Sequence, residues 1–293
     1  MRRRLPGWLL PRTEPAGRSR LMPHFPDGPE IALPAGDVTE GVVRIGDTVR
    51  RPHQPTSAAV AAYLEHLASV GFAGAPRYLG RDNQGRDVLS FIDGAVPGDP
   101  VQPWAAADDL LPSVGQLVRA LHEAAAGWEP SIALAWPVAG RPAPPLPEGE
   151  PRLVAQRDVT PQNTVFRDGA AVALIDFDLV GWTTRSVDLA NAAMHWVPLC
   201  DPRDRGPAYR DIDVGVRLRL LLNGYGTDAV SGQQLLDAAA LRSGAAYESM
   251  RWNAEHLGGG WARMWEAGVG GVIQRRVAWF AAVRHQLAAA LAG

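Results

Sequence analysis

Three polar side chains in one short stretch, residues 156–178, have the types and spacing that phosphoryl transfer needs. Asp158 and Asn163 lie in a loop before a predicted strand, and Asp176 ends the next one. The letters TVFRDGAAVALIDFD predict a β-hairpin with Asp-Gly at its turn, and paired strands would return Asp176 beside the loop. A carboxylate can take a proton from a hydroxyl, while an amide and a second carboxylate can hold Mg²⁺.

The elements before this stretch predict a small antiparallel sheet. Short β-prone runs, EIALPAG, GVVRIG and DTVRRP, are separated by Gly and Asp, and PRYLGRDNQGRDVLSFIDG indicates strand, turn and strand. Between them, TSAAVAAYLEHLASVGF predicts a helix that Thr56 or Ser57 can cap and that Gly71 ends.

Long helical patterns dominate the second half. In LLPSVGQLVRALHEAAAG the apolar residues share one helix face, and from Ser186 the chain is predicted to be mostly helix. The expected fold class is α+β, with a small antiparallel-sheet N-terminal lobe and a larger, mainly helical C-terminal lobe. We expect a flexible Arg/Pro-rich leader at 1–29, a nucleotide-binding lobe at 30–93, and a lobe with the loop and an acceptor pocket at 94–293.

Composition sets limits on partners and on the available cations. Hydrophobic residues make up 46% and charged residues 20%, and the net charge is −2, which gives no reason to expect nucleic acid or an obligate protein partner. No apolar run reaches the roughly 18 residues that span a bilayer. The single cysteine, Cys200, excludes an internal disulfide and fits a reducing, cytoplasmic setting. The sequence contains no lysine, so all 29 basic residues are arginine.

Several motifs in the same order resemble the aminoglycoside phosphotransferase and choline kinase family. RDVTPQN resembles its D-x-x-x-x-N catalytic loop, LIDFD its metal-binding Asp, and RSVDLANAA the helix start that follows. LPAGDVTEGVVRIG is similar to its nucleotide loop, VLSFIDG to its hinge, and VRALHEA to the Leu-His helix before the loop. The resemblance runs from about Glu30 to the C-terminus and implies a two-lobed, protein-kinase-like fold.

The resemblance also implies roles for the polar residues. Asp158 would be the catalytic carboxylate, and Asn163 and Asp176 the Mg²⁺ ligands. Asp178 would either touch a second metal ion or cap the turn before GWTT. Asp188 would support the loop as the N-cap of the next helix.

For the nucleotide, ATP or GTP, the resemblance implies Gly36 and Gly41 in the loop and Ser90 and Ile92 at the hinge. Only twelve positions separate Asp176 from Asp188, which is too short for the activation segment of a protein kinase. The implied activity is Mg²⁺-dependent transfer of the γ-phosphate to a hydroxyl of a small molecule.

Two departures from the family pattern motivate an alternative. Gln156 stands where the family has His, and the phosphate-binding lysine is replaced by Arg50 or Arg51, which alternation places on opposite faces of a strand. Glu65 would either orient the inward arginine or lie in solvent. Asp37 and Glu40 add negative charge to the nucleotide loop. The alternative is a pseudokinase-like binding or regulatory module without phosphoryl transfer.

The histidines and tryptophans considered as further site residues are interpreted mainly as packing residues. His122, His195 and His285 lack a metal-binding spacing and are interpreted as packed core histidines. Trp261 and Trp265 share a helix face, which would line either the core or an acceptor pocket. Residues 201–293 contain eleven arginines and nine acidic residues, so this part of the chain is not strongly acidic. That argues against a polycationic aminoglycoside as acceptor, which would prefer a negative pocket.

Overall fold

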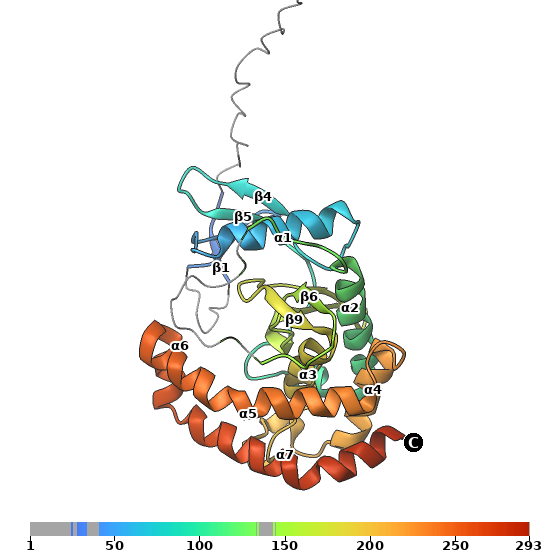
Figure 1. Ribbon diagram of the computed structural model, residues 1–293. Coiled ribbons are helices and arrows are strands. Elements are labelled where there is room, and N and C mark those ends of the chain that lie inside the picture. The colour runs from blue at the N-terminus through green and yellow to red at the C-terminus, as the bar shows by residue number, and fades with distance from the viewer. Residues whose placement is uncertain are drawn as a thin grey trace, which may run out of the picture.

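The computed structural model describes residues 25, 28–33, 41–132, 134, 143 and 145–292. A five-stranded sheet and one helix form the upper lobe in Figure 1, and helices form most of the lower lobe. The sheet is antiparallel with strand order β1-β2-β3-β5-β4, as the short β-prone runs predict. Its strands are β1 (Ile31–Ala32), β2 (Val43–Ile45), β3 (Thr48–Arg51), β4 (Tyr78–Arg81) and β5 (Asp87–Ser90). The expected α+β, two-lobed architecture is confirmed.

Helix α1 (Ser57–Ser69) lies beside this sheet and is anchored to the lower lobe. The Tyr63 hydroxyl donates to the carbonyl of Val154 at 3.0 Å, and Nε2 of His66 bonds the carbonyl of Ala124 at 2.9 Å. Just beyond the helix, the carbonyl of Gly74 accepts from the N–H of Leu174 at 2.9 Å. Helix α1 and the segment that follows it are therefore attached at three points to the other lobe.

The ends of α1 correct one expectation. The helix stops before Gly71, which has φ +80°, as predicted. Neither Thr56 nor Ser57 caps its start, because the Ser57 hydroxyl bonds the buried carboxylate of Asp87 instead. The Thr56 hydroxyl is buried and has no hydrogen-bond partner in the described part of the chain.

The connection between the lobes is paired with the catalytic hairpin. Ala95 and Phe166 exchange backbone hydrogen bonds of 2.9 and 2.8 Å, and Arg167 donates to the carbonyl of Asp93. Gly94 has φ +148°, and a Cβ there would collide with the carbonyl oxygen of Phe166. The segment that connects the lobes is therefore held against strand β7 by backbone hydrogen bonds.

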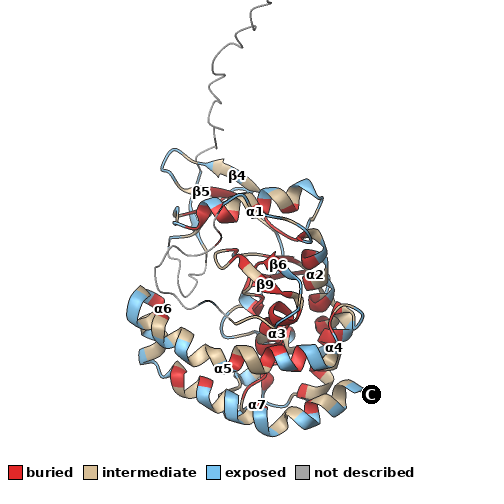
Figure 2. Cartoon of the chain, viewed as in Figure 1, coloured by how far each residue is buried: buried red, intermediate tan, exposed pale blue. Residues whose placement is uncertain are grey.

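The lower lobe is built on helices α2 (Leu111–Ala124), α3 (Arg185–Trp196), α4 (Val214–Tyr225), α5 (Gly232–Leu257), α6 (Gly259–Glu266) and α7 (Val269–Ala292). Short 3₁₀ helices occupy Pro103–Ala106, Asp108–Leu110, Pro161–Asn163, Pro202–Asp204 and Pro207–Tyr209. Buried residues concentrate in α2 and α3 at the centre, and the outer faces of α5, α6 and α7 are exposed (Figure 2). No helix among the described residues is long and apolar enough to span a membrane.

Two short antiparallel pairs hold the loop of interest. Strands β7 (Thr164–Arg167) and β8 (Ala170–Leu174) form the predicted hairpin, with positive φ at both Asp168 and Gly169. Strands β6 (Arg152–Ala155) and β9 (Gly181–Thr184) form a second pair that the sequence reading did not predict. The loop runs from β6 to β7, so both pairs fix its ends.

The expected N-cap role of Asp188 is wrong. Thr184 caps α3 with its side chain, because the helix begins three residues earlier than the expected cap. Asp188 is buried within α3 and accepts a hydrogen bond of 2.9 Å at Oδ2 from Nε2 of His122. Nδ1 of His122 lies 2.8 Å from the Tyr225 hydroxyl. The packed-core expectation is confirmed for His122, whereas His285 is exposed.

Glycines allow α2 and α4 to pack at very close range. A Cβ on Gly115 would collide with the carbonyl oxygen of Leu221, and one on Gly224 with that of Pro112. Gly115→Ala should therefore lower the free energy of unfolding by about 1–3 kcal/mol through overpacking. Urea unfolding followed by circular dichroism measures this change.

Gly244→Ala is the matched control, because no atom lies within 4 Å of the Cβ position in the exposed part of α5. It should raise the free energy of unfolding by about 0.5–1 kcal/mol, since alanine favours helix over glycine. Equal effects of the two substitutions would contradict the close-packing argument.

Candidate active site

The side chain of Gln156 ties the predicted catalytic loop to the strand that carries Asp176. Its Nε2 donates to the carbonyls of Ile175 at 2.9 Å and Asp176 at 2.8 Å. Its Oε1 accepts from the N–H of Asp158 at 2.8 Å. Gln156 is fully buried, so each bond satisfies a group that water does not reach.

These bonds join two strained backbone segments. Arg157 has φ +67° and Asp176 has φ +55°, in the left-handed region that costs an L-residue roughly 1–2 kcal/mol. Asn191 supports the first segment by donating to the carbonyl of Arg157 at 2.8 Å. Strain of this kind persists where surrounding contacts over-determine the conformation, and it is common at functional sites.

Asn163 faces Asp158. Its Nδ2 donates to Oδ2 of Asp158 at 2.8 Å and to the Asp158 carbonyl at 3.1 Å. The Asn163 carbonyl accepts from the N–H of Ile175 at 2.8 Å, which aligns the loop with the residue before Asp176. The structure thus brings Asp158, Asn163 and Asp176 into one site, as the hairpin argument predicts.

Arg51 reaches this site from the other lobe. Its Nη2 bonds Oδ1 of Asp178, and its Nη1 lies 3.9 Å from Oδ1 of Asp176. Burial disfavours the Arg51 charge, but the carboxylates of Asp178 and Asp176 outweigh this, so the pKa of Arg51 is raised. Desolvation and the charge of Asp178 raise the pKa of Asp176, which Arg51 partly opposes.

The opposite strand face holds Arg50. Its Nη1 bonds the Thr48 hydroxyl, its Nε lies 3.6 Å from the Asp82 carboxylate, and its guanidinium lies 5.1 Å from the Phe25 ring centroid. The two arginines lie on opposite faces of β3, as alternation predicts, and Arg51 is the one that faces Asp176 and Asp178.

The other sequence-predicted residues are less closely associated with this site. Glu65 is exposed on α1 and forms no ion pair with a described arginine, so the alternative in which it orients Arg51 is wrong. The Ser90 hydroxyl accepts from the N–H of Arg77 at 2.9 Å. The Ile92 main chain forms no hydrogen bond with described residues. Gly41 has φ +78°. The other loop residues, Gly36, Asp37 and Glu40, lie outside the described residues. So does the expected leader at 1–29, apart from Phe25 and Gly28–Pro29.

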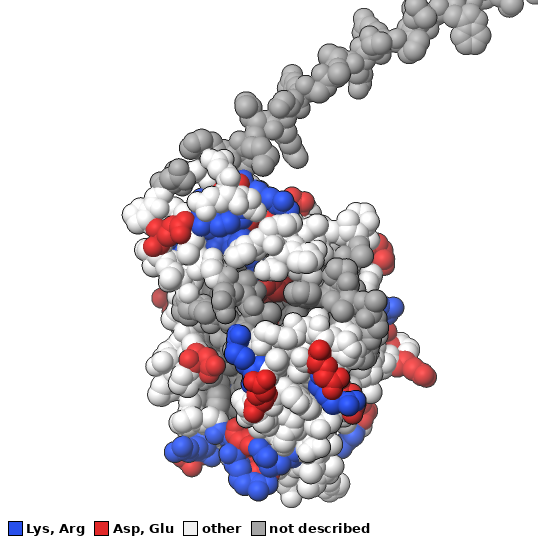
Figure 3. Space-filling model, turned by 90° about the vertical axis from the view of Figure 1, so that its left-hand side faces the viewer, with Lys and Arg blue, Asp and Glu red and all other residues white. Residues whose placement is uncertain are grey.

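The donor set is hard and oxygen-rich. The amide nitrogen of Asn163 donates to Asp158, so the Oδ1 of Asn163 remains for a cation. The Asp176 side chain is 41% exposed, so its carboxylate is also accessible. No group of three or more His, Cys, Asp or Glu side chains within the described ranges is arranged to hold a metal. Two protein ligands fit Mg²⁺, which takes its other ligands from phosphate and water. Figure 3 shows acidic atoms between the two lobes.

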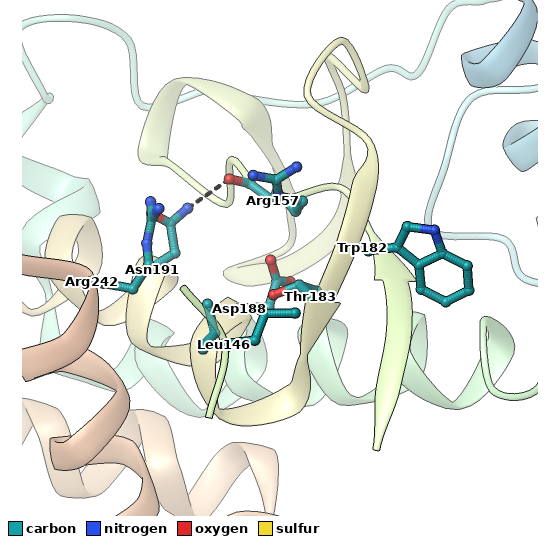
Figure 4. Close-up of a pocket in the computed structure, with 8 residues that line it drawn as sticks. Leu146, Arg157, Trp182, Thr183, Asp188, Asn191 and Arg242 are labelled. Carbon is teal, nitrogen blue, oxygen red and sulfur yellow. Dashed lines mark hydrogen bonds between the residues drawn. The ribbon is translucent and has the colours of Figure 1, made fainter. Parts of the chain in front are cut away.

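A small pocket that is open to solvent lies beside the loop (Figure 4). Arg157 and Asp188 line it together with Asn191 of α3 and Arg242 of α5. Arg242 was not singled out by the sequence, because a single arginine in a helical pattern carries no local signal. Trp265 packs on Tyr247, with 5.3 Å between ring centroids, and neither it nor Trp261 lines this pocket.

The sequence is similar to proteins of known families. Residues 125–213 match the profile described as "Phosphotransferase enzyme family", a range that includes Asp158, Asn163 and Asp176. The chain is 34% identical over 280 residues to the trifolitoxin immunity protein of Rhizobium leguminosarum bv. trifolii, which covers 90% of this chain and 99% of that relative.

Solved structures share the fold at low sequence identity. A choline/ethanolamine kinase family protein from Mesorhizobium loti matches with a TM-score of 0.53 and 16% identity, over 91% of this chain and 93% of its own. An amicoumacin kinase in complex with AMP-PNP and Ca²⁺ has a TM-score of 0.55 at 11% identity, covering 78% and 83% of the two chains. The ADP-bound aminoglycoside phosphotransferase APH(2'')-Ib has a TM-score of 0.50 at 13% identity, covering 86% and 94%.

The contacts of Gln156 generate a stability prediction. Gln156→Glu keeps the side-chain size but replaces the donor that faces two carbonyls with an oxygen, so the free energy of unfolding at pH 8 should fall by about 2–4 kcal/mol. Urea unfolding measures this change. Gln162→Glu, on the exposed side of the same loop, is the control and should stay within about 0.5 kcal/mol of the original chain. Similar losses in both variants would show that the bridge does not hold the loop.

Proposed function

Because this chain belongs to the phosphotransferase enzyme family, in its aminoglycoside phosphotransferase and choline kinase group, we propose that it transfers the γ-phosphate of ATP or GTP to a hydroxyl of a small molecule. The observation that carries this proposal is the bridge of Gln156, which holds the Asp158 loop against the Asp176 strand. That contact supports the proposal that the loop can hold Asp158 in place for catalysis although Gln replaces the histidine of the family.

Asp158 is the group that takes the proton. The acceptor oxygen forms its bond to the γ-phosphorus while the bond between that phosphorus and the bridging oxygen breaks, and the nucleoside diphosphate leaves with that electron pair. The proton of the acceptor hydroxyl passes to Asp158. Asn163 supports this role because its amide donates to one carboxylate oxygen of Asp158 at 2.8 Å and so orients the carboxylate.

Asn163 and Asp176 are the residues that would hold Mg²⁺, with Asp178 beside them. When bound, Mg²⁺ would supply positive charge that balances the negative charge developing on the phosphate oxygens. Arg51 would clasp the phosphate oxygens in place of the missing lysine. Its planar guanidinium can bond two oxygens at once and stays charged at any physiological pH.

The immunity relative favours a second candidate function. That protein is named for immunity to trifolitoxin, and this chain matches it over almost its full length. Immunity can arise when a protein binds a toxin without modifying it. In that case the fold acts as a binding module, and Arg51 remains with Asp176 and Asp178 instead of engaging phosphate.

Replacement of the proton acceptor separates the two functions. Asp158→Asn should reduce Mg²⁺-dependent ADP release with a panel of hydroxylated acceptors by about 10²–10⁴-fold, because the carboxamide cannot take a proton. Nucleotide binding should persist. Asp168→Asn at the exposed hairpin turn is the control, since Asn tolerates its positive φ. Turnover that survives in Asp158→Asn would remove Asp158 from the mechanism, and no turnover in the unmodified chain would favour the binding module.

The two adjacent arginines provide a second test. Arg51→Gln should weaken ATP or GTP binding by about tenfold or more, because it loses charge-assisted bonds to phosphate. Arg50→Gln, one position away on the opposite face, should leave the affinity near that of the original chain. Thermal-shift titration with and without Mg²⁺ measures both, and Asp176→Ala should abolish the Mg²⁺-dependent part. Loss of binding in Arg50→Gln alone would reverse the assignment.

A further inference from the structure

A partly buried arginine, Arg242, lines the pocket beside the catalytic loop and forms no salt bridge with a described carboxylate. Arg242 donates from Nη2 to Oδ1 of Asn191 at 2.9 Å, and Asn191 in turn donates to the carbonyl of Arg157. Nε of Arg242 is buried and has no hydrogen-bond partner in the described part of the chain. Figure 4 shows Arg242 next to Asn191, on the same side of the pocket.

A second cation stands close to the first. Nε of Arg276, on α7, is also buried without a hydrogen-bond partner among the described residues. Burial lowers the pKa of Arg242, and Arg276 lowers it further, while Asp188 and Asp158 act in the opposite sense. Burial and the positive charges of Arg276 and Arg242 lower the pKa of His195 to about 4. The protein thus places two guanidinium groups and a neutral imidazole together.

Three other arginines of this lobe are neutralised. Arg217, Arg275 and Arg284 each form a salt bridge, with Asp108, Asp204 and Asp237 respectively. Within the described residues, neither Arg242 nor Arg276 lies within 4.0 Å of a carboxylate oxygen. Asp188 also lines the pocket: His122 bonds its Oδ2, and its Oδ1 is buried without a hydrogen-bond partner among the described residues, so one carboxylate stands against Arg157 and Arg242 in the lining. A buried guanidinium N–H without an acceptor is costly unless a ligand supplies one.

We propose that this pocket binds an anionic group of the acceptor, a carboxylate or a phosphate ester, through Arg242, in the positive field that Arg276 adds. The inference rests on the proposed phosphotransferase function for its biological meaning, because the pocket adjoins Arg157, the residue before Asp158. An acceptor whose anion sits at Arg242 would present a hydroxyl toward Asp158. Guanidinium groups suit this task, since they bond two oxygens of a carboxylate or phosphate. The substrate class is then a hydroxylated acid or phosphate ester, and not an amine.

The test uses four three-carbon alcohols that differ in charge: D-glycerate, sn-glycerol 3-phosphate, glycerol and serinol. Each is titrated into the full-length protein at constant ionic strength without nucleotide, and the melting temperature is followed. D-glycerate or glycerol 3-phosphate should raise it, and the two distinguish a carboxylate from a phosphate site. Glycerol and serinol should leave it unchanged.

Two variants locate the anion. Arg242→Gln should weaken anion binding by about tenfold or more, through loss of charge-assisted bonds. Arg251→Gln on the same helix is the control, because Arg251 is half exposed and pairs with Glu248. Arg276→Gln gives a second variant if Arg242→Gln does not fold. A purely structural role for Arg242 predicts that the unliganded variant melts at a lower temperature, whereas an uncompensated charge predicts that it melts at the same or a higher one.

The outcomes separate this inference from the proposed function. Anion binding that depends on Arg242, without any ADP release, supports the anionic pocket and rejects phosphoryl transfer. ADP release with glycerol or serinol, but with neither anion, supports phosphoryl transfer and overturns the anionic pocket. No anion-dependent stabilisation at 50-fold excess over protein and up to about 50 mM ligand, or equal stabilisation in Arg242→Gln, also overturns it.

Discussion

The three hydrogen bonds of the Gln156 side chain are the contact on which the site depends. They connect the segment before Asp158 to the segment at Asp176, and each segment contains a residue with positive φ. They act together with the bond between the Asn163 carbonyl and the N–H of Ile175, which also joins the loop between β6 and β7 to the segment after β8. An amide provides both donors and an acceptor in one planar group, which suits a position between two carbonyls and an N–H.

The absence of lysine changes how charge is handled. A lysine ammonium is a compact charge that loses its proton readily when buried, whereas a guanidinium keeps its charge and needs several acceptors. In this chain Arg51 satisfies that need with two carboxylates, and Arg217 with a carboxylate and two carbonyls. Arg205, Arg242 and Arg276 differ, because none of them forms a salt bridge within the described residues and the Nε of each is buried without an acceptor there.

Local patterns predicted the elements but not their tertiary partners. The hairpin follows from Asp168-Gly169, whose turn chemistry acts over two residues, and alternation predicted that Arg50 and Arg51 face opposite ways. Which arginine faces the carboxylates depends on how the whole sheet sits on the other lobe, which no local signal encodes. The β6–β9 pair joins short strands about thirty residues apart, and long-range pairing leaves little periodic trace. Asp188 was assigned to a helix cap because its true partner, His122, lies on another helix. The functional roles of the site residues remain predictions.

The anchoring of α1 has a consequence for control. In protein kinases, movement of the helix that follows the third strand sets activity through an ion pair between its glutamate and the strand lysine. Here Tyr63 and His66 of α1 bond to Val154 and Ala124, and Gly74 beyond the helix bonds to Leu174. Glu65 is exposed and forms no ion pair with a described arginine, so a rotation of α1 could not act through such a pair.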